Sequence, residues 1–244
     1  MKSLLSLFAF LFVFICLLRG QEENPGLKIV HLTDNFYVFT TWKKYDQTLF
    51  PSNGMYLVTD KGVVMFDTPW DETRFQPLLD SIWRRHKKEV IICISTHSHA
   101  DRTAGLEYYR GKGIKTYTTK QTDDISKVKN EKRAEYLIYS DTVFHVGKYR
   151  FQVYYPGKGH APDNIVVWFE KEKILYGGCF VKSMEANGLG NLEDADVEAW
   201  ENSIINLSRK FGKPEFIVPG HQDWHSDQAL DHTLQLIREY KDKK

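Results

Sequence analysis

The chain has 244 residues, of which 42% are hydrophobic and 14% aromatic. This composition excludes an intrinsically disordered chain and is sufficient for one sizeable core. The formal net charge is only +1, so no strong field of one sign indicates nucleic acid or an acidic partner.

The first 20 residues differ from the rest of the chain. Lys2 precedes a strongly apolar stretch, residues 4–18, and polar residues follow it. This order is typical of a secretory signal peptide. An uncleaved membrane anchor is the alternative, but the stretch is shorter than the ~20 residues that a spanning helix needs. We therefore expect residues 1–20 to be removed, so that residues 21–244 form one periplasmic domain that is not held in the membrane.

In the first half of the chain, apolar periodicity predicts strands and helices in alternation. Residues 29–42 are predicted to form a strand, and residues 54–70 a hairpin, because apolar and β-branched residues alternate there. A helix follows, and its regular part is expected to start near Pro77. The next expected elements are a buried strand at 89–96, a short helix at 102–110, a strand at 114–119 and a helix at 123–136.

The second half continues this alternation. The predicted strands are 141–147, 149–157, a hairpin at 164–178 and a final strand at 215–220. Before the final strand lies a helix that Asp196 caps and Gly212 ends. The last helix is expected from about Asp227, with Ser226 as its N-cap. Hairpins separated by helices favour a layered α/β or α+β domain.

Side chains that can bind a metal follow four of the predicted strands. They are His97, His99 and Asp101 after residues 89–96, His160 after 149–157, Cys179 after 164–178 and His221 after 215–220. Loops at strand ends can converge even when they are distant in sequence. A mixture of imidazole, carboxylate and thiolate suits zinc, and a catalytic zinc takes three protein ligands and leaves one position for water. Six such residues therefore predict two open zinc sites.

The remaining cysteine and histidines are interpreted as surface or structural residues. Cys93 lies inside an apolar strand, where an inert thiol is expected, although in an exported protein it could also form a disulfide with Cys179. The other five histidines have no comparable setting, and we expect them at the surface or in structural roles: His31, His86, His145, His225 and His232.

Five short motifs, taken together, resemble those of one enzyme family. They are "HSHADR", "GKGHAPDN", "GGCFVKS", "LGN" and "PGHQDW", and they are similar to the motifs of the zinc metallo-β-lactamases, in the subclass with a cysteine ligand. The resemblance runs from about Leu27 to Tyr240 and is strongest to the chromosomal enzymes of flavobacteria. It implies a single-domain αβ/βα sandwich, with residues 21–244 as the catalytic domain.

The resemblance also implies roles for individual residues. His97, His99 and His160 would bind a first zinc, and Asp101, Cys179 and His221 a second, which gives two Zn²⁺ per chain. Lys182 would bind the substrate carboxylate, and Asn191 would lie near the lactam carbonyl. Residues 41–51, which contain Trp42 and Phe50, would form a flap over the groove.

The function implied is hydrolysis of β-lactam antibiotics, namely penicillins, cephalosporins and carbapenems, which gives antibiotic resistance. We expect a metal-bound hydroxide to attack the lactam carbonyl, with Asp101 orienting it and Asn191 helping to stabilise the oxyanion. Another hydrolase on the same fold, acting on thioesters or lactones, and a non-catalytic periplasmic zinc protein are the alternatives. No long heptad pattern forces assembly, so a monomer is expected.

Two positions separate this chain from other hydrolases of similar fold. Those relatives usually carry H-x-H-x-D-H and a bridging aspartate, whereas this chain has Arg102 and Cys179 at the corresponding places. Both residues favour the β-lactamase interpretation, since fold alone does not decide function. Minor departures from the family are Ala161 in place of Thr and the pair Ala104–Gly105 in place of two glycines.

Overall fold

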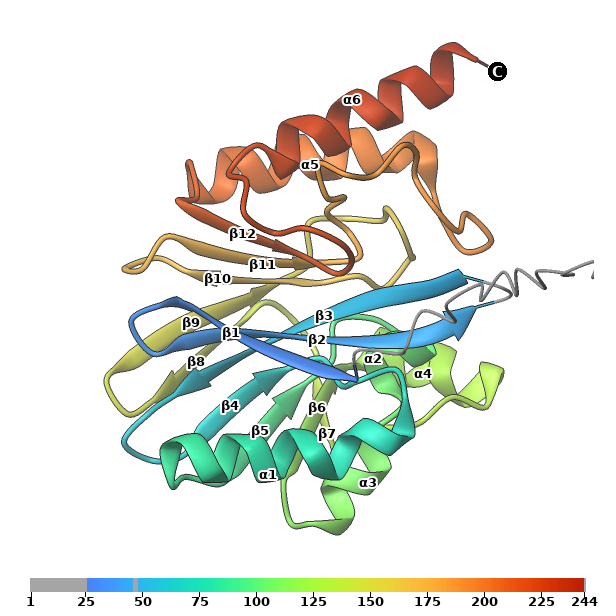
Figure 1. The fold of residues 1–244 in the computed structure, drawn as a ribbon. Coiled ribbons are helices and arrows are strands. Elements are labelled where there is room, and N and C mark those ends of the chain that lie inside the picture. The colour runs from blue at the N-terminus through green and yellow to red at the C-terminus, as the bar shows by residue number, and fades with distance from the viewer. Residues whose placement is uncertain (1–25, 46–47, 244) are drawn as a thin grey trace, which may run out of the picture.

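The computed structural model describes residues 26–45 and 48–243. The predicted signal peptide, residues 1–20, lies outside these residues. Within the described ranges, the chain folds into two sheets that pack face to face, with helices on both outer faces (Figure 1). The αβ/βα sandwich expected from the resemblance is therefore confirmed.

The first sheet has the strand order β1-β2-β3-β4-β5-β6-β7. Its strands are β1 (Leu27–Thr33), β2 (Phe36–Tyr45), β3 (Thr48–Val58), β4 (Val63–Phe66), β5 (Val90–Ile94), β6 (Lys115–Thr119) and β7 (Tyr136–Ile138). The first four strands form an antiparallel meander, and the last four are parallel. Parallel strands bring their carboxyl ends to one edge of the sheet, which is where β5 delivers the predicted histidines.

The second sheet has the order β12-β11-β10-β9-β8. Its strands are β8 (Thr142–Val146), β9 (Tyr149–Tyr154), β10 (Val166–Phe169), β11 (Ile174–Gly178) and β12 (Phe216–Pro219). β8 to β11 are antiparallel and β12 is parallel to β11. The loops after β11 and β12 therefore leave the sheet at the same edge.

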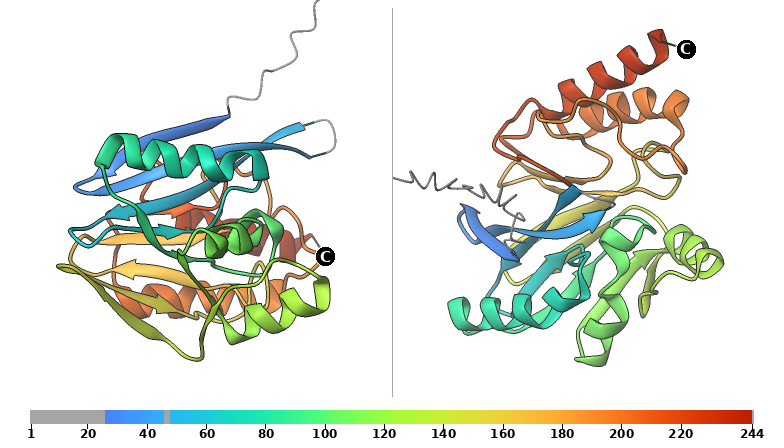
Figure 2. Two further views of the ribbon diagram at one scale, coloured as in Figure 1. Left: turned by 90° about the horizontal axis from the view of Figure 1, so that it is seen from below. Right: turned by 45° about the vertical axis from the view of Figure 1, so that its right-hand side comes forward.

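The helices separate into two outer layers (Figure 2). α1 (Phe75–His86), α2 (Ala100–Thr103), α3 (Leu106–Gly111) and α4 (Lys120–Lys129) belong to the first sheet. α5 (Val197–Phe211) and α6 (Ala229–Asp242) cover the second. None of the helices in the described part of the chain is long and apolar enough to span a membrane.

Three apolar clusters fill the spaces between the layers. The central cluster joins the two sheets and contains Phe66, Phe151 and Phe169. A second joins α5 and α6 to the second sheet around Trp200, and a third joins α1 to the first sheet around Phe75. Because successive residues of a strand point to opposite faces, β4 contributes Val64 and Phe66 to the central cluster and Val63 and Met65 to the third.

Some of the predicted elements need correction. Residues 29–42 are the β1–β2 hairpin and not one strand, because Asp34 takes a left-handed conformation (φ 44°) and turns the chain. The helix predicted at 123–136 is α4, which begins at Lys120 after the N-cap Thr119 and ends at the left-handed Asn130. β7 was not expected, since its three residues carry little periodicity of their own. The helix predicted at 102–110 is two short helices, α2 and α3. The last helix, α6, begins at Ala229 after Gln228 and has no side-chain cap, so Ser226 is not its N-cap. The remaining strands and helices lie close to their predicted positions.

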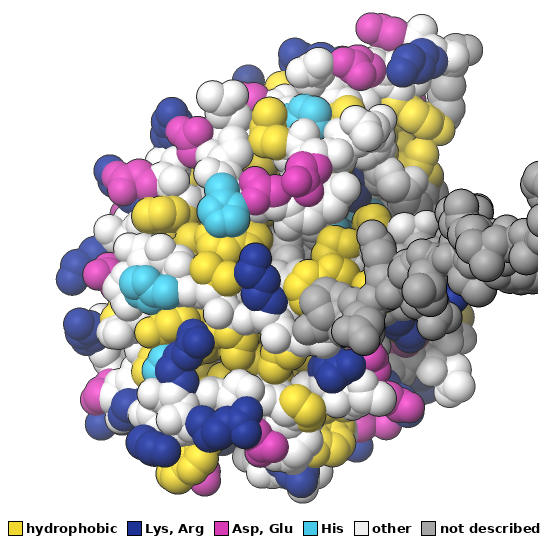
Figure 3. Space-filling view, viewed as in Figure 1, with side chains coloured by type: hydrophobic (Ala, Val, Ile, Leu, Met, Phe, Trp, Pro, Cys, Tyr) yellow, Lys and Arg dark blue, Asp and Glu magenta, His cyan; other side chains and the backbone are white. Residues whose placement is uncertain are grey.

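Figure 3 shows the surface from the same side as Figure 1, and basic and acidic side chains are intermixed on it.

Cys93 and Cys179 are both buried free thiols. The disulfide that the sequence allowed between them is therefore not formed.

Candidate metal centre

Loops at one edge of the sandwich bring the six predicted donor residues together. His97 and His99 follow β5, and Asp101 lies in the first turn of α2. His160 follows β9, while Cys179 and His221 follow β11 and β12 directly or after one residue. The last two loops approach closely at Gly220, where a Cβ atom would lie 2.7 Å from the backbone nitrogen and Sγ of Cys179. Only glycine permits that approach.

Three imidazoles form one cluster. The ring centroids of His97, His99 and His160 are 4.6–5.0 Å apart, and the rings are nearly perpendicular to one another. His160 Nε2 lies 3.2 Å from His99 Nδ1. Both nitrogens of buried His97 and Nδ1 of buried His160 have no hydrogen-bond partner among the described residues. Buried polar atoms are normally satisfied, and a cation among the three rings would satisfy one of the two His97 nitrogens.

A carboxylate, a thiol and an imidazole form the adjoining cluster. Asp101 Oδ2 lies 3.3 Å from Cys179 Sγ and 3.1 Å from His221 Nε2, and the thiol is 3.2 Å from that same nitrogen. Two other groups of donor atoms within 4.8 Å join His97 to residues of both clusters, one with His160 and Cys179 and one with His99 and Asp101. The two clusters are therefore contiguous.

Arg102 lies beneath the second cluster and is completely buried. Its Nε donates to Asp101 Oδ2 at 2.9 Å, and its Nη1 lies 3.2 Å from Asp67 Oδ2, so two carboxylates neutralise it. The guanidinium also donates to Ser52 Oγ and to the carbonyls of Asn53 and Gly220. Arg102 thereby links α2 to β3 and to the loop that carries His221.

Backbone and side-chain partners orient single imidazoles. His221 Nδ1 lies 2.7 Å from the Pro51 carbonyl, to which it can donate, and this leaves Nε2 facing Asp101 and Cys179. His99 Nε2 lies 2.7 Å from Asp194 Oδ2, which leaves Nδ1 facing His160. Asp194 also pairs with Lys129 of α4. Partners of this kind fix the tautomer of metal-binding histidines in proteins.

Burial and charge set the protonation of these groups. Burial lowers the pKa of His97 and His160 well below the usual range, with neighbouring cations acting in the same direction. Burial opposes the charge of Asp101, but Arg102, a hydrogen bond from His221 and the nearby imidazoles together outweigh burial and hold the pKa of that carboxyl well below its usual range. Burial raises the pKa of the Cys179 thiol. Neutral imidazoles and a charged carboxylate are the forms that bind a metal, and a bound cation displaces a thiol proton.

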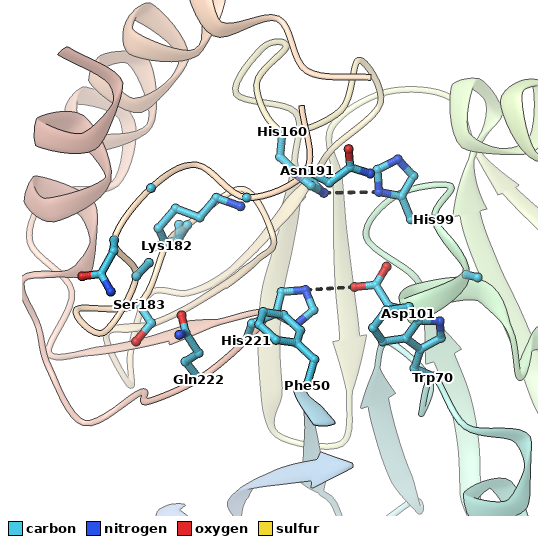
Figure 4. Close-up of a pocket in the computed structure, with 16 residues that line it drawn as sticks. Phe50, Trp70, His99, Asp101, His160, Lys182, Ser183, Asn191, His221 and Gln222 are labelled. Atoms are coloured by element: carbon cyan, nitrogen blue, oxygen red, sulfur yellow. Dashed lines mark hydrogen bonds and ion pairs between the residues drawn. The ribbon is translucent and has the colours of Figure 1, made fainter. Parts of the chain in front are cut away.

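A cavity of about 510 Å³ opens onto both clusters (Figure 4). His99 and His160 from the first cluster and Asp101 and His221 from the second line it. Trp70 and Phe50 form an apolar wall, and Phe50, on β3, has its ring 5.0 Å from that of His221. Phe50, an apolar residue of the predicted flap, lines this cavity. The flap is an extension of the β2–β3 hairpin, and residues 46–47 at its turn lie outside the described residues.

The predicted substrate-binding residues line the same cavity. Lys182 Nζ lies 5.2 Å from the centroid of the Trp200 ring, and the ammonium faces the cavity from the side opposite Trp70 in Figure 4. Asn191 Oδ1 accepts the Glu193 backbone N–H at 3.0 Å, which fixes the side-chain amide. The structure thus brings all eight predicted site residues to one place.

Sequence reasoning missed several residues that support the site. Asp194, Asp67 and Trp70 carry no spacing signal that separates them from ordinary loop residues, because their partners are distant in sequence. The other five histidines lie outside the donor groups. His225, for example, pairs with Asp223 and stacks on Trp224.

The donor chemistry fits zinc. The set supplies imidazole nitrogen, carboxylate oxygen and thiolate sulfur, which is the mixture that zinc accepts. A cation among the three rings would bind one of the two His97 nitrogens, which have no hydrogen-bond partner in the described part of the chain. Three donors in each cluster would leave a position open toward the cavity.

The chain has clear relatives among known proteins. The model of the metallo-beta-lactamase superfamily matches residues 48–221. The metallo-beta-lactamase type 2 of Elizabethkingia meningoseptica is 49% identical over 222 residues, which cover 91% of this chain and 89% of that protein. Metallo-beta-lactamase IND-1 of Chryseobacterium indologenes is 39% identical over 84% of this chain and 86% of its own length. The solved metallo-beta-lactamase from Pontibacter korlensis, 33% identical, matches with a TM-score of 0.84 over 87% of this chain and 99% of that chain.

Proposed function

Because this chain belongs to the metallo-beta-lactamase superfamily, we propose that it is a zinc-dependent hydrolase that opens the β-lactam ring of antibiotics and so confers resistance. The observation that carries this proposal is the pair of adjoining donor clusters that face one cavity together with Lys182. Penicillins, cephalosporins and carbapenems are the proposed substrates.

The proposed first zinc is held by His97, His99 and His160, and the second by Asp101, Cys179 and His221. Zinc in such a site acts as a Lewis acid, which makes a water nucleophilic near neutral pH and polarises the scissile carbonyl. The protein's contribution is to keep the six donors in place. Burial keeps His97 neutral, and Arg102 helps to keep Asp101 charged.

Asp101 is proposed to act on the attacking water as well as on the metal. It lines the cavity, and Arg102 together with the neighbouring histidines keeps it charged, so it can accept a hydrogen bond from the attacking water and orient it. Asn191 lines the same cavity, where its amide can donate to the lactam carbonyl as negative charge develops there.

Lys182 is proposed to bind the substrate carboxylate. Its ammonium faces the cavity, and its flexible stem presents a point charge without the fixed fork of an arginine. An anionic substrate would therefore lie between Lys182 at one end and the apolar wall of Trp70 and Phe50 at the other. The carboxylate anchor orients the ring so that its carbonyl meets the metal centre.

The remaining proposals concern processing and assembly. Residues 1–20 are proposed to be a signal peptide, and residues 21–244 the periplasmic catalytic domain, which works as a monomer. These proposals rest on the sequence, since the structure describes the chain only from residue 26.

The deciding experiment is hydrolysis of a chromogenic cephalosporin by purified protein, with the zinc content measured in the same sample. We expect about two zinc ions per chain under metal-replete conditions, and loss of turnover after chelation with recovery on zinc addition. Full activity after exhaustive metal removal would sink the proposal.

A matched pair of variants separates the site from the rest of the histidines. His160→Ala should reduce turnover by at least about a hundredfold, because it removes one of three donors of the first cluster. His145→Ala, at an exposed position on β8, should leave turnover and zinc content unchanged. Equal effects of the two changes would remove His160 from the centre.

A further inference from the structure

The loop that carries both Cys179 and Lys182 is attached to the two C-terminal helices. This loop has no regular hydrogen-bonding pattern of its own after β11 ends at Gly178. Trp200 of α5 donates its Nε1–H to the Phe180 carbonyl at 3.1 Å. Thr233 of α6 accepts the Lys182 backbone N–H at 2.8 Å. Two contacts from the outer helical layer therefore hold a loop of the site.

Thr233 makes this contact from a fully buried position. Its side chain is 0% exposed, and its neighbours in the buried stripe of α6 are aliphatic: Leu230, Leu236 and Ile237. The hydroxyl donates to the Ala229 carbonyl at 2.6 Å and uses its acceptor side for the Lys182 N–H. A hydroxyl has one O–H donor and two acceptor lone pairs, so it can make both hydrogen bonds at once.

A threonine is an unfavourable choice at this position for the helix alone. Its β-branched side chain lowers helix propensity, and a hydroxyl that bonds back to the preceding turn tends to weaken or bend the helix. Valine would fill the same space without a polar atom in the core. The hydroxyl of Thr233 makes a contact outside the helix, with the Lys182 N–H, and this contact explains why a residue that destabilises the helix stands there.

The side chain of Lys182 is held by the same layer. Its ammonium lies over the ring of buried Trp200 at 5.2 Å, and Nζ is 3.7 Å from the position of a Cβ atom on Gly190. The lysine stem therefore crosses from its backbone anchor at Thr233 over Trp200 to the wall of the cavity. Without a fixed origin, this flexible stem would lose more rotamer freedom when a ligand binds.

We propose that Thr233 is a positioning residue, which holds the backbone of Lys182 so that its ammonium stands at the cavity wall before an anionic substrate arrives. This inference rests on the proposed β-lactamase function. Preorganisation of this kind lowers the entropy lost on binding. It therefore acts on the carboxylate of the substrate, not on the bond that breaks, and its loss should appear in KM.

The test compares Thr233→Val with Thr233→Ser. Valine preserves the shape and removes the hydroxyl, whereas serine keeps the hydroxyl. We expect Thr233→Val to raise KM for a chromogenic cephalosporin about fivefold with kcat little changed, since one hydrogen bond of uniform binding corresponds to about that factor. Thr233→Ser should stay within about twofold of wild type.

The same cephalosporin with its ring carboxylate esterified distinguishes positioning from general damage. The ester cannot pair with Lys182, so Thr233→Val should leave its KM unchanged. Zinc content should also be unchanged, because a merely structural loss would loosen the Cys179 end of the loop as well. In a Lys182→Ala background, Thr233→Val should add nothing to KM.

The outcomes are separable. No chelator-sensitive turnover by the wild type would contradict the proposed function. Wild-type turnover together with an equal rise in KM for acid and ester, or with additive effects of the two substitutions, would overturn the role of Thr233. If Thr233→Val does not fold, Thr233→Ala is compared in the same way. A ratio of acid KM to ester KM that is the same in Thr233→Ala as in the wild type would overturn the proposal.

Discussion

The two donor clusters face the same cavity, but the protein supports them differently. Asp101, Cys179 and His221 lie on a buried network, in which Arg102 donates to Asp101 and to the loop that carries His221. Among the described residues, no comparable buried hydrogen-bond network supports the three histidines of the other cluster. Of these, His99 is held by Asp194 near the surface, and His97 has no hydrogen-bond partner within the described ranges.

This difference indicates how much each cluster depends on metal. The second cluster has internal contacts and a buried cation, so its polar atoms are largely satisfied without a metal. The first contains buried nitrogens whose lack of partners is costly until a cation binds. We therefore expect metal to order the first cluster, and the Arg102 network to hold the second in either state.

Removal of Arg102 should have the largest effect, because it takes away the support of one cluster only. Arg102→Ala leaves Asp67 and Asp101 buried without their cation, and breaking such a pair costs about 3–5 kcal/mol in the free energy of unfolding. Denaturant unfolding of the metal-free protein measures this. Arg102→Lys keeps the charge but loses the forked guanidinium, so its free energy of unfolding should lie between those of the wild type and Arg102→Ala. A loss below about 1 kcal/mol for the alanine variant would show that the network does not hold the second cluster.

Cys179→Ser should separate the clusters by metal content. Serine is a poorer ligand for zinc than a thiolate, so the zinc content should fall from about two ions per chain to about one. Metal analysis after dialysis, with the zinc-binding isotherm, measures the change. Cys93→Ser is the matched control, since Cys93 is buried in the third apolar cluster away from the donors. Unchanged zinc content in Cys179→Ser would remove this thiol from the proposed set.

Asp194→Asn should have a smaller effect, confined to the three-histidine cluster. The amide cannot hold His99 as an ionised carboxylate does, so zinc affinity of this cluster should fall about tenfold. Lys129→Met, which removes only the cation beside Asp194, should lower the affinity less. Lys120→Met is the control, because the Lys120–Asp124 pair lies on the same helix without contact to His99. Competition with a chromophoric chelator measures these affinities, and a Lys129 effect no larger than that of Lys120 would show that the ion pair is not coupled to the metal site.

Much of the fold follows from short-range patterns in the chain. Alternating apolar residues predicted β3, β4, β10 and β11, and Asp196 predicted the start of α5, where its side chain accepts the Ala199 N–H. The exceptions are places where local signals are weak. Three-residue β7 is held by pairing with β6, and the turn at Asp34 depends on one left-handed residue between two apolar runs.

The donor residues could be predicted because each follows a strand, and the chemistry of His, Asp and Cys in that pattern is restrictive. Their supports could not, because Asp194 meets His99 across 95 residues and Thr233 meets Lys182 across 51. An aspartate in a loop and a threonine in a helix look ordinary until the layers pack. The residues of the chain specified which groups could bind metal; the packing of α5, α6 and the loops against the sheets specified which groups hold them, since hydrogen bonds between distant segments exist only in the folded protein.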